Sequence, residues 1–119
     1  KLKDLFENSK DINLKDCYIL QIGRHFRVSP ETKLIITRNE KESKRIFNFC
    51  NENDLLIFSE KNPEVIGVIK GKIENIIFEI YGSYLKVDDL CSVKNLKGEV
   101  VEKRIVSRNK KYNYMKFLL

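Results

Sequence analysis

Four consecutive residues near the start of the chain could bind a phosphate-rich ligand. In Arg24-His25-Phe26-Arg27, two arginines flank an aromatic residue. An extended chain would place Arg24 and Phe26 on one side and His25 and Arg27 on the other. Arginine forks bind phosphate oxygens, and aromatic rings stack on unpaired bases. The segment therefore favours contact with a nucleic-acid backbone and its bases.

A second basic segment, Arg38-Asn39, stands between an expected buried strand at 33–37 and an expected helix. Asn39 suits a helix N-cap, and Glu42 three residues later would close a capping box. Backbone N–H groups at a helix start attract anions, and Arg38 would add a fork for phosphate. The alternative is structural, with Asn39 as a cap and Arg38 paired with Glu42 or Glu40.

Lysines in the same stretch extend this basic region. The residues we predict to bind RNA are Arg24, His25, Arg27, Lys33, Arg38, Asn39 and Lys41. A second basic region lies near the end of the chain and is either a solvated face or a surface that follows a nucleic-acid backbone. It comprises Lys103, Arg104, Arg108, Lys110 and Lys111.

The sequence offers little for catalysis or metal binding. His25 is the one histidine, and a catalytic role would need a nucleophile such as a cysteine brought close by the fold. Cys17, Cys50 and Cys91 have no metal-ligand spacing, and glycine-rich phosphate loops are absent. We therefore expect no catalytic residues and no metal. A small enzyme that combines His25 with a cysteine is the least favoured hypothesis.

Composition indicates a folded, basic domain. Of 119 residues, 42% are hydrophobic and 34% charged, and the net charge is +6. This charge favours a polyanionic partner, with RNA first, although solubility or a lysine-rich codon bias would also explain it. No apolar run reaches the ~18 residues of a membrane helix. Without a signal peptide, and with reduced cysteines, we expect a cytoplasmic location.

Periodicity predicts an α+β fold with a mixed or antiparallel sheet, two main helices and a C-terminal β-meander. Helices are expected at 39–51 and 73–84. Residues 1–15 would be a linker or a short helix from an upstream domain, and 16–119 a single domain. The start at Lys1 rather than Met is consistent with a fragment. Strands are expected at 17–22, 25–28, 33–37, 54–58, 90–94, 99–107 and 112–118, and residues 65–69 are a short apolar stretch.

Residues 20–27 and 33–42 resemble the RNA-binding domain shared with NFACT-type proteins. They are most similar to the version found C-terminal to the ATP-pyrophosphatase domain of tRNA 2-thiouridylase-like proteins. The likeness rests on Gly-Arg-His-Phe-Arg at 23–27 and on Arg-Asn-x-x-Glu at 38–42. Pro63 and the helix that carries Tyr81 and Tyr84 would be later counterparts. The chain departs from the pattern at Thr37, where glycine is expected, and at Ser43, where asparagine is expected.

The resemblance implies a non-catalytic accessory domain that holds RNA, in particular tRNA, for an upstream catalytic domain. That domain would be the sulfur-transferring part of a tRNA-modifying transferase and would contain the ATP site and the reactive cysteine. No cofactor is then expected here. The surface to test would comprise Arg24, His25, Arg27, Arg38 and Asn39. The alternative from the residues is an interdomain or protein–protein scaffold without direct RNA contact.

Overall fold

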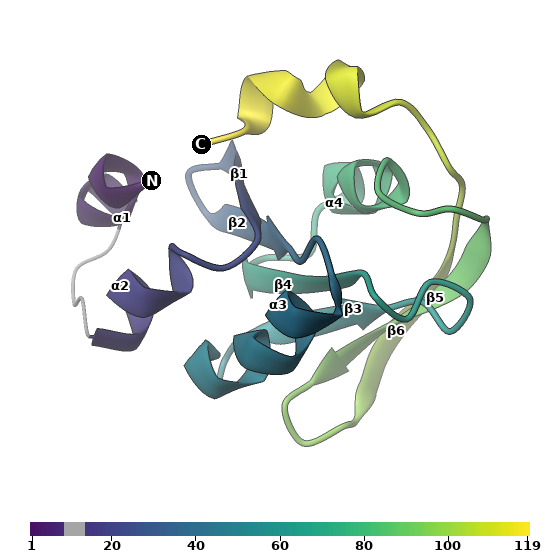
Figure 1. The fold of residues 1–119 in the computed structure, drawn as a ribbon, viewed down its shortest axis with the longest axis horizontal. Helices are drawn as coiled ribbons and strands as arrows, with labels where there is room; N and C mark the ends of the chain where they lie inside the picture. The colour runs from purple at the N-terminus through teal and green to yellow at the C-terminus, as the bar shows by residue number, and fades with distance from the viewer. Residues whose placement is uncertain (9–13) are drawn as a thin grey trace.

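One six-stranded antiparallel sheet organises the chain, in the strand order β1-β2-β4-β3-β5-β6 (Figure 1). The computed structural model describes residues 1–8 and 14–119, without the side chains of 15, 16 and 111–113. The strands are β1 (Arg24–Ser29), β2 (Thr32–Ile36), β3 (Leu55–Phe58), β4 (Ile66–Gly71), β5 (Asp89–Asn95) and β6 (Val100–Val106).

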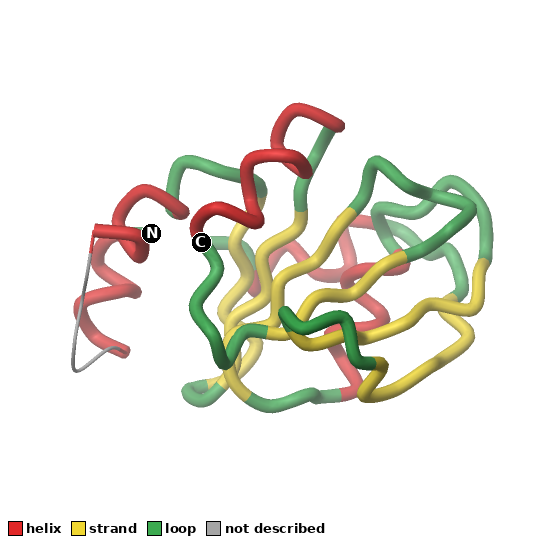
Figure 2. Tube along the Cα trace, turned by 90° about the horizontal axis from the view of Figure 1, so that it is seen from below, coloured by secondary structure: helices red, strands yellow, loops and turns green. Residues whose placement is uncertain are grey.

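Helices lie on both faces of this sheet. One face carries α2 (Leu14–Ile19), α3 (Glu40–Ile46) and the 3-10 turn η1 (Phe47–Phe49), and the other carries α4 (Asn75–Gly82) and the 3-10 segment η2 (Lys111–Phe117) (Figure 1). The first helix, α1 (Leu2–Asn8), lies with α2 beside one edge of the sheet (Figure 2).

The two faces bury two separate apolar clusters. Leu34 and Ile36 of β2 pack toward α4, whereas Ile35 between them packs toward α2 and α3. All five residues of β2 are buried, which is the pattern of a strand covered on both faces. Each buried Leu or Ile contributes about 1.5–3 kcal/mol relative to exposure. The buried centre of the sheet therefore holds in place the strand ends that carry the basic residues.

The α+β fold with an antiparallel sheet is confirmed. The expected strands at 25–28, 33–37, 54–58, 90–94 and 99–107 correspond to β1, β2, β3, β5 and β6, and the short apolar stretch at 65–69 is β4. The expected helix at 39–51 is α3 followed by η1, and the one at 73–84 is the shorter α4. Hydrophobic periodicity located these elements because their apolar residues fall at the spacing that strands and helices require.

The expected strand at 17–22 is wrong, because this run is the end of α2 and a turn. Ile19 and Ile22 are three residues apart and both are buried against α3, a spacing that suits a helical turn as well as a strand. The turn ends at Gly23, whose φ is +73°. A Cβ there would lie 2.6 Å from the carbonyl oxygen of Ile36, so the position requires glycine.

The expected strand at 112–118 is also wrong, because these residues form η2 and only an isolated bridge pairs Leu118 with Phe26. The backbone N–H of Leu119 donates to the carbonyl of His25 at 2.8 Å. The predicted three-stranded meander is therefore the β5–β6 hairpin, followed by a segment that covers the edge of β1.

The predicted division at residue 15 falls within α2, and residues 9–13 lie outside the described part of the chain. The upstream domain, and the division into 1–15 and 16–119, stay predictions. In the ranges that the structure describes, each helix is too short or too polar to cross a membrane.

Candidate nucleic-acid interface

Three elements that are distant in sequence meet at one corner of the sheet. Arg24 begins β1 opposite Ile36, Arg38 lies just beyond the end of β2, and Tyr84 follows α4. Burial raises the pKa of the Tyr84 hydroxyl, whereas the nearby Arg24 and Arg38 lower it, so both arginines lie close to this hydroxyl. The Tyr84 ring makes an edge contact with Phe26, with ring centres 6.0 Å apart. We call Arg24, Arg38 and Tyr84 the basic corner.

Glu42 of α3 holds this corner together from beneath. Its carboxylate accepts hydrogen bonds from the backbone N–H groups of Gly23 at 3.0 Å and of Arg38 at 2.8 Å. The Arg38 guanidinium adds two more, at 3.1 and 2.7 Å. The hydrogen bonds from Arg38 are the largest cause that lowers the pKa of Glu42 to about 2. Glu42 is therefore ionised at neutral pH and ties β1 to β2.

The start of α3 is therefore occupied by a carboxylate of the chain itself. Asn39 is the N-cap, as predicted, and its side-chain oxygen accepts the N–H of Glu42 at 2.9 Å. The capping box is altered, because the Glu42 carboxylate accepts from Arg38 and Gly23 instead of returning to the Asn39 N–H. The Arg38 and Gly23 N–H groups are thus satisfied, and a phosphate here would bind side chains.

Positive charge nevertheless remains exposed at the corner. The Arg38 side chain is 48% exposed, and Lys41 is exposed on the first turn of α3. Lys1 lies close by, because its pKa is lowered by burial and by the charges of Arg38 and Arg24, while Glu42 opposes them. Several cations thus face a single paired carboxylate, which leaves a surface suited to phosphate oxygens.

The two departures from the resembled pattern contact each other. The hydroxyls of Thr37 and Ser43 are hydrogen-bonded at 2.7 Å, and both residues are buried. Ser43 also donates to the carbonyl of Glu64 at 2.7 Å, and the Ile66 N–H donates to the Thr37 hydroxyl at 2.9 Å. The pair forms one network that fastens the β2–α3 turn to the chain leading into β4.

His25 is fully buried and has no place at the corner surface. Its Nε2 lies 3.1 Å from the carbonyl of Ile19 and 3.0 Å from that of Ile22, so it carries the proton and donates to both. Burial and then the charge of Lys33 lower the pKa of His25 to about 3. Cys91 lies in the apolar cluster on the other face, and burial raises its pKa to about 11. His25 therefore acts as a neutral structural donor.

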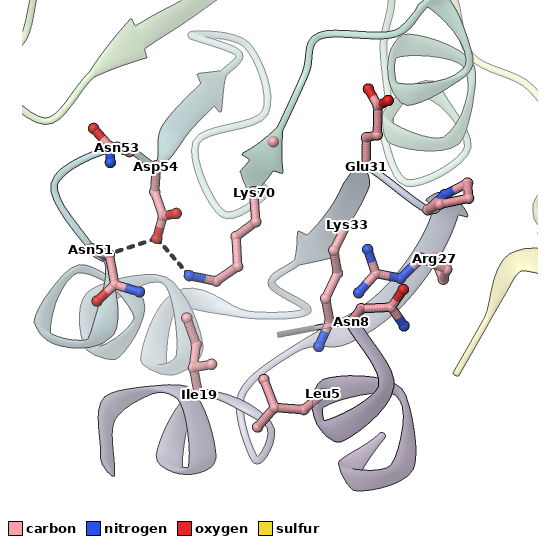
Figure 3. A pocket seen from close by; sticks show the side chains of 12 residues that line it. Leu5, Asn8, Ile19, Arg27, Glu31, Lys33, Asn51, Asn53, Asp54 and Lys70 are labelled. Carbon is pink, nitrogen blue, oxygen red and sulfur yellow. Dashed lines mark hydrogen bonds and ion pairs between the residues drawn. The ribbon is translucent and has the colours of Figure 1, made fainter. Parts of the chain in front are cut away.

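Arg27 and Lys33 point away from the corner, toward a cavity of about 350 Å³ beside α1 (Figure 3). The Arg27 guanidinium forms a two-pronged pair with Asp4, at 2.9 and 2.8 Å. The Lys33 ammonium lies 3.9 Å from the same carboxylate. The predicted alternation along β1 is confirmed, since Phe26 packs toward α4 while His25 and Arg27 face α2 and α1.

The predicted binding residues thus fall into three places. Arg24, Arg38, Asn39 and Lys41 gather at the basic corner, Arg27 and Lys33 line the cavity, and His25 is buried. From the sequence, Tyr84 was named only as part of the helix at 73–84, and its position near Arg24 was not predicted. The one signal in the sequence was its position at the end of the apolar pattern at 73–84.

In the second basic region, Arg104 is held by structural contacts. Its guanidinium lies over the Phe78 ring at 4.0 Å and donates to Asn75 at 2.8 Å. It also pairs with Glu102 at 2.8 Å. Within 1–8 and 14–119, no three His, Cys, Asp or Glu residues gather as a metal site requires.

Comparisons with known proteins identify a family and show structural relatives of the fold. Residues 23–82 match the family model described as the NFACT protein RNA binding domain. The solved C-terminal part of the fibronectin/fibrinogen-binding protein from Streptococcus suis is similar, with a TM-score of 0.63 at 10% identity. The match covers 99% of this chain and 58% of that one, so it extends over less than two thirds of that structure. At this identity it shows the fold alone. No curated protein matches the sequence.

Proposed function

The chain belongs to the NFACT protein RNA-binding domain family, and on that premise we propose that it binds RNA through the basic corner. The observation that carries this proposal is the meeting of Arg24, Arg38 and Tyr84, from three separate parts of the chain, at one partly exposed place. Arg24 and Arg38 lie within the matched span of 23–82. The matched region therefore supplies most of the corner.

The chemistry of the corner suits RNA better than a generic anion. The two guanidinium groups bind phosphate oxygens as forks, and Lys41 adds a flexible point charge nearby. The half-exposed Tyr84 ring offers a surface on which an unpaired base stacks. These contacts give an affinity that depends on salt and shows little preference for sequence.

Within this function we propose tRNA as the ligand and a tRNA 2-thiouridylase-like protein as the parent. The domain would hold the tRNA so that its target uridine enters an upstream catalytic domain. The ATP site and the reactive cysteine would belong to that upstream domain. This domain would contribute neither a catalytic group nor a cofactor.

The test is fluorescence anisotropy with labelled tRNA and three matched variants. Arg24→Ala and Lys41→Ala each remove one corner cation, whereas Lys72→Ala removes an exposed cation at the far end of β4, paired with Glu31. We expect the first two to weaken binding and the third to leave it unchanged. Equal effects of all three would mean that net charge, rather than the corner, accounts for binding.

A second candidate function, docking of a protein, rests on the open face of the β5–β6 hairpin. Leu90 and Ile105 are cross-strand neighbours, 53% and 74% exposed, with Lys103 on the same face. Adjacent exposed apolar side chains are typical of an interface. Hydrogen exchange of the β6 backbone amides would distinguish RNA binding from protein docking. Protection in the full-length parent relative to the isolated domain would support docking, and equal exchange would exclude it.

A further inference from the structure

The cavity beside α1 is a second basic site, and we propose that it binds one phosphate group of a small molecule or of an RNA end. Its volume is about 350 Å³. Its walls come from α1, from the β1–β2 hairpin, from the turn before β3 and from the end of β4. Figure 3 shows Arg27 and Lys33 on one side of it and Lys70 on the other.

Lys33 is the residue that needs a ligand. Its side chain is only 6% exposed, and it lines the cavity with an ion pair to Asp4 as its closest charged contact. The Asp4 carboxylate is 3.9 Å away, which is too far for a hydrogen bond. An ammonium group has three donors, and a single ion pair at 3.9 Å leaves it able to bind a further acceptor. An acceptor in the cavity would satisfy them.

The other cations of the cavity already have carboxylate partners. Arg27 takes both oxygens of Asp4, at 2.9 and 2.8 Å. Lys70 pairs with Asp54 at 2.6 Å. Glu31 at the rim pairs with the exposed Lys72 at 2.6 Å. Arg27, Lys33 and Lys70 thus pair with only two carboxylates, those of Asp4 and Asp54. Lys33 is the cation whose charge is least balanced.

The pKa of Lys33 reflects the same imbalance. Burial is the main cause that lowers it to about 8, and the charges of Arg27 and Lys70 add to this effect. Asp4 opposes them without restoring the ordinary value. A bound anion would therefore raise the pKa of Lys33 again, which gives the site a measurable signature.

A phosphate group fits this arrangement better than a carboxylate. Its oxygens point in several directions, so one group can reach Lys33 while it also contacts Arg27 or Lys70. The cavity exceeds the size of one phosphate, which leaves room for the rest of a small molecule or for a terminal nucleotide. Because Lys33 and Tyr84 face opposite sides of the sheet, phosphate binding here is independent of RNA binding at the basic corner.

The test measures the chemical reactivity of Lys33 in the intact chain. At pH 8 the protein would be treated with formaldehyde and a mild hydride reductant, and methylation of each lysine followed by mass spectrometry. The probes are inorganic phosphate, AMP, and one short RNA with a 5′-phosphate or a 5′-hydroxyl. If bound phosphate raises the pKa of Lys33 from about 8 by about one unit, its free amine and methylation rate at pH 8 fall about fivefold. Exposed Lys97 is the internal reference.

Protection of Lys33 by inorganic phosphate and AMP would identify a small-molecule site. Stronger protection by the 5′-phosphorylated RNA than by the 5′-hydroxyl RNA would identify a site for an RNA end. An unchanged rate with every probe, or the same slowing with sodium chloride at equal ionic strength, would overturn the proposal. Direct titration of Lys33→Met and Lys72→Met by calorimetry with inorganic phosphate gives a second measurement, in which only the Lys33 variant should lose binding.

Discussion

At the scale of single residues, Glu42 determines the shape of the basic corner. Its carboxylate fixes the backbone of Gly23 and Arg38 and orients the Arg38 guanidinium. The same carboxylate occupies the backbone donors that a phosphate would otherwise take. The corner therefore presents oriented arginine side chains to a ligand rather than a helix terminus.

This role of Glu42 predicts how its partner can be changed. Arg38→Ala removes two hydrogen bonds from a buried carboxylate, and we expect a loss of about 1 kcal/mol because Arg38 itself is half exposed. In a Glu42→Gln background the same change should cost less, because no charge remains to be compensated. Urea denaturation of the natural chain, the two single variants and the double variant measures the stability cost of Arg38→Ala in each background. Equal costs in the two backgrounds would contradict the role assigned to Glu42.

His25 makes stability depend on pH. Its folded pKa of about 3 lies below its ordinary value of 6.5, so between these values the unfolded chain binds a proton that the folded chain does not. Stability should therefore be constant above about pH 6.5 and fall as the pH decreases toward 3. Between pH 7 and 5.5 we expect a loss of about 1 kcal/mol, before most carboxylates titrate.

Urea denaturation at pH 7 and 5.5 measures this loss. His25→Gln has a side-chain amide that can still donate toward the Ile19 and Ile22 carbonyls, but it does not titrate. Its stability should be nearly the same at the two pH values, even if it is lower overall. A loss in the variant as large as in the natural chain would assign the pH dependence to other groups.

At the scale of elements, the sequence was sufficient where a regular pattern met a matching core. Five of the six strands and the helices α3 and α4 were expected near their observed places, whereas β4 was identified only as a short apolar stretch. The run at 17–22 was misread because two buried isoleucines three residues apart suit either structure. The segment at 112–118 has strand-like composition, but Tyr114, Phe117 and Leu118 pack on the core from a 3-10 conformation. Tertiary packing outweighed propensity there.

The site was predictable only where its residues are neighbours in sequence. The cap at Asn39 and the pair Arg38–Glu42 follow from spacing alone. The partner of Arg27 and Lys33 is Asp4, more than twenty positions away, and nothing local indicates it. The meeting of Arg24 with Tyr84 likewise depends on how α4 returns to the start of β1. Such contacts become visible only in the folded chain.

The β2–α3 turn supports a prediction about coupled side chains. Thr37 and Ser43 share a hydrogen bond and the same loop carbonyl, that of Glu64. Thr37→Val and Ser43→Ala should each destabilise the fold, and the double variant should lose less than the sum. The expected coupling is about 0.5–2 kcal/mol, measured from the free energies of unfolding of the four proteins. Additive losses would mean that the two hydroxyls act separately.

At the scale of the whole molecule, the net charge of +6 is spread over cations of two kinds, those paired with carboxylates and those left exposed. Arg27, Lys70 and Arg104 are held by carboxylates of the chain, and Lys33 is buried. The cations available to a large polyanion include those of the basic corner, at the end of the sheet where α4 and β2 finish. Overall charge therefore does not locate the binding surface. The binding surface depends on which cations lack a carboxylate partner of the chain itself.

The measurement that tests the central claim most directly is the salt dependence of tRNA binding to the natural chain and to Arg24→Ala. Fluorescence anisotropy from low to physiological salt, with duplex DNA as control, gives the slope of log affinity against log salt. RNA binding at the corner predicts saturable binding that prefers tRNA and falls steeply with salt. The slope should be about one unit shallower in the variant. Absence of binding at low salt, or equal slopes for the two proteins, would contradict it.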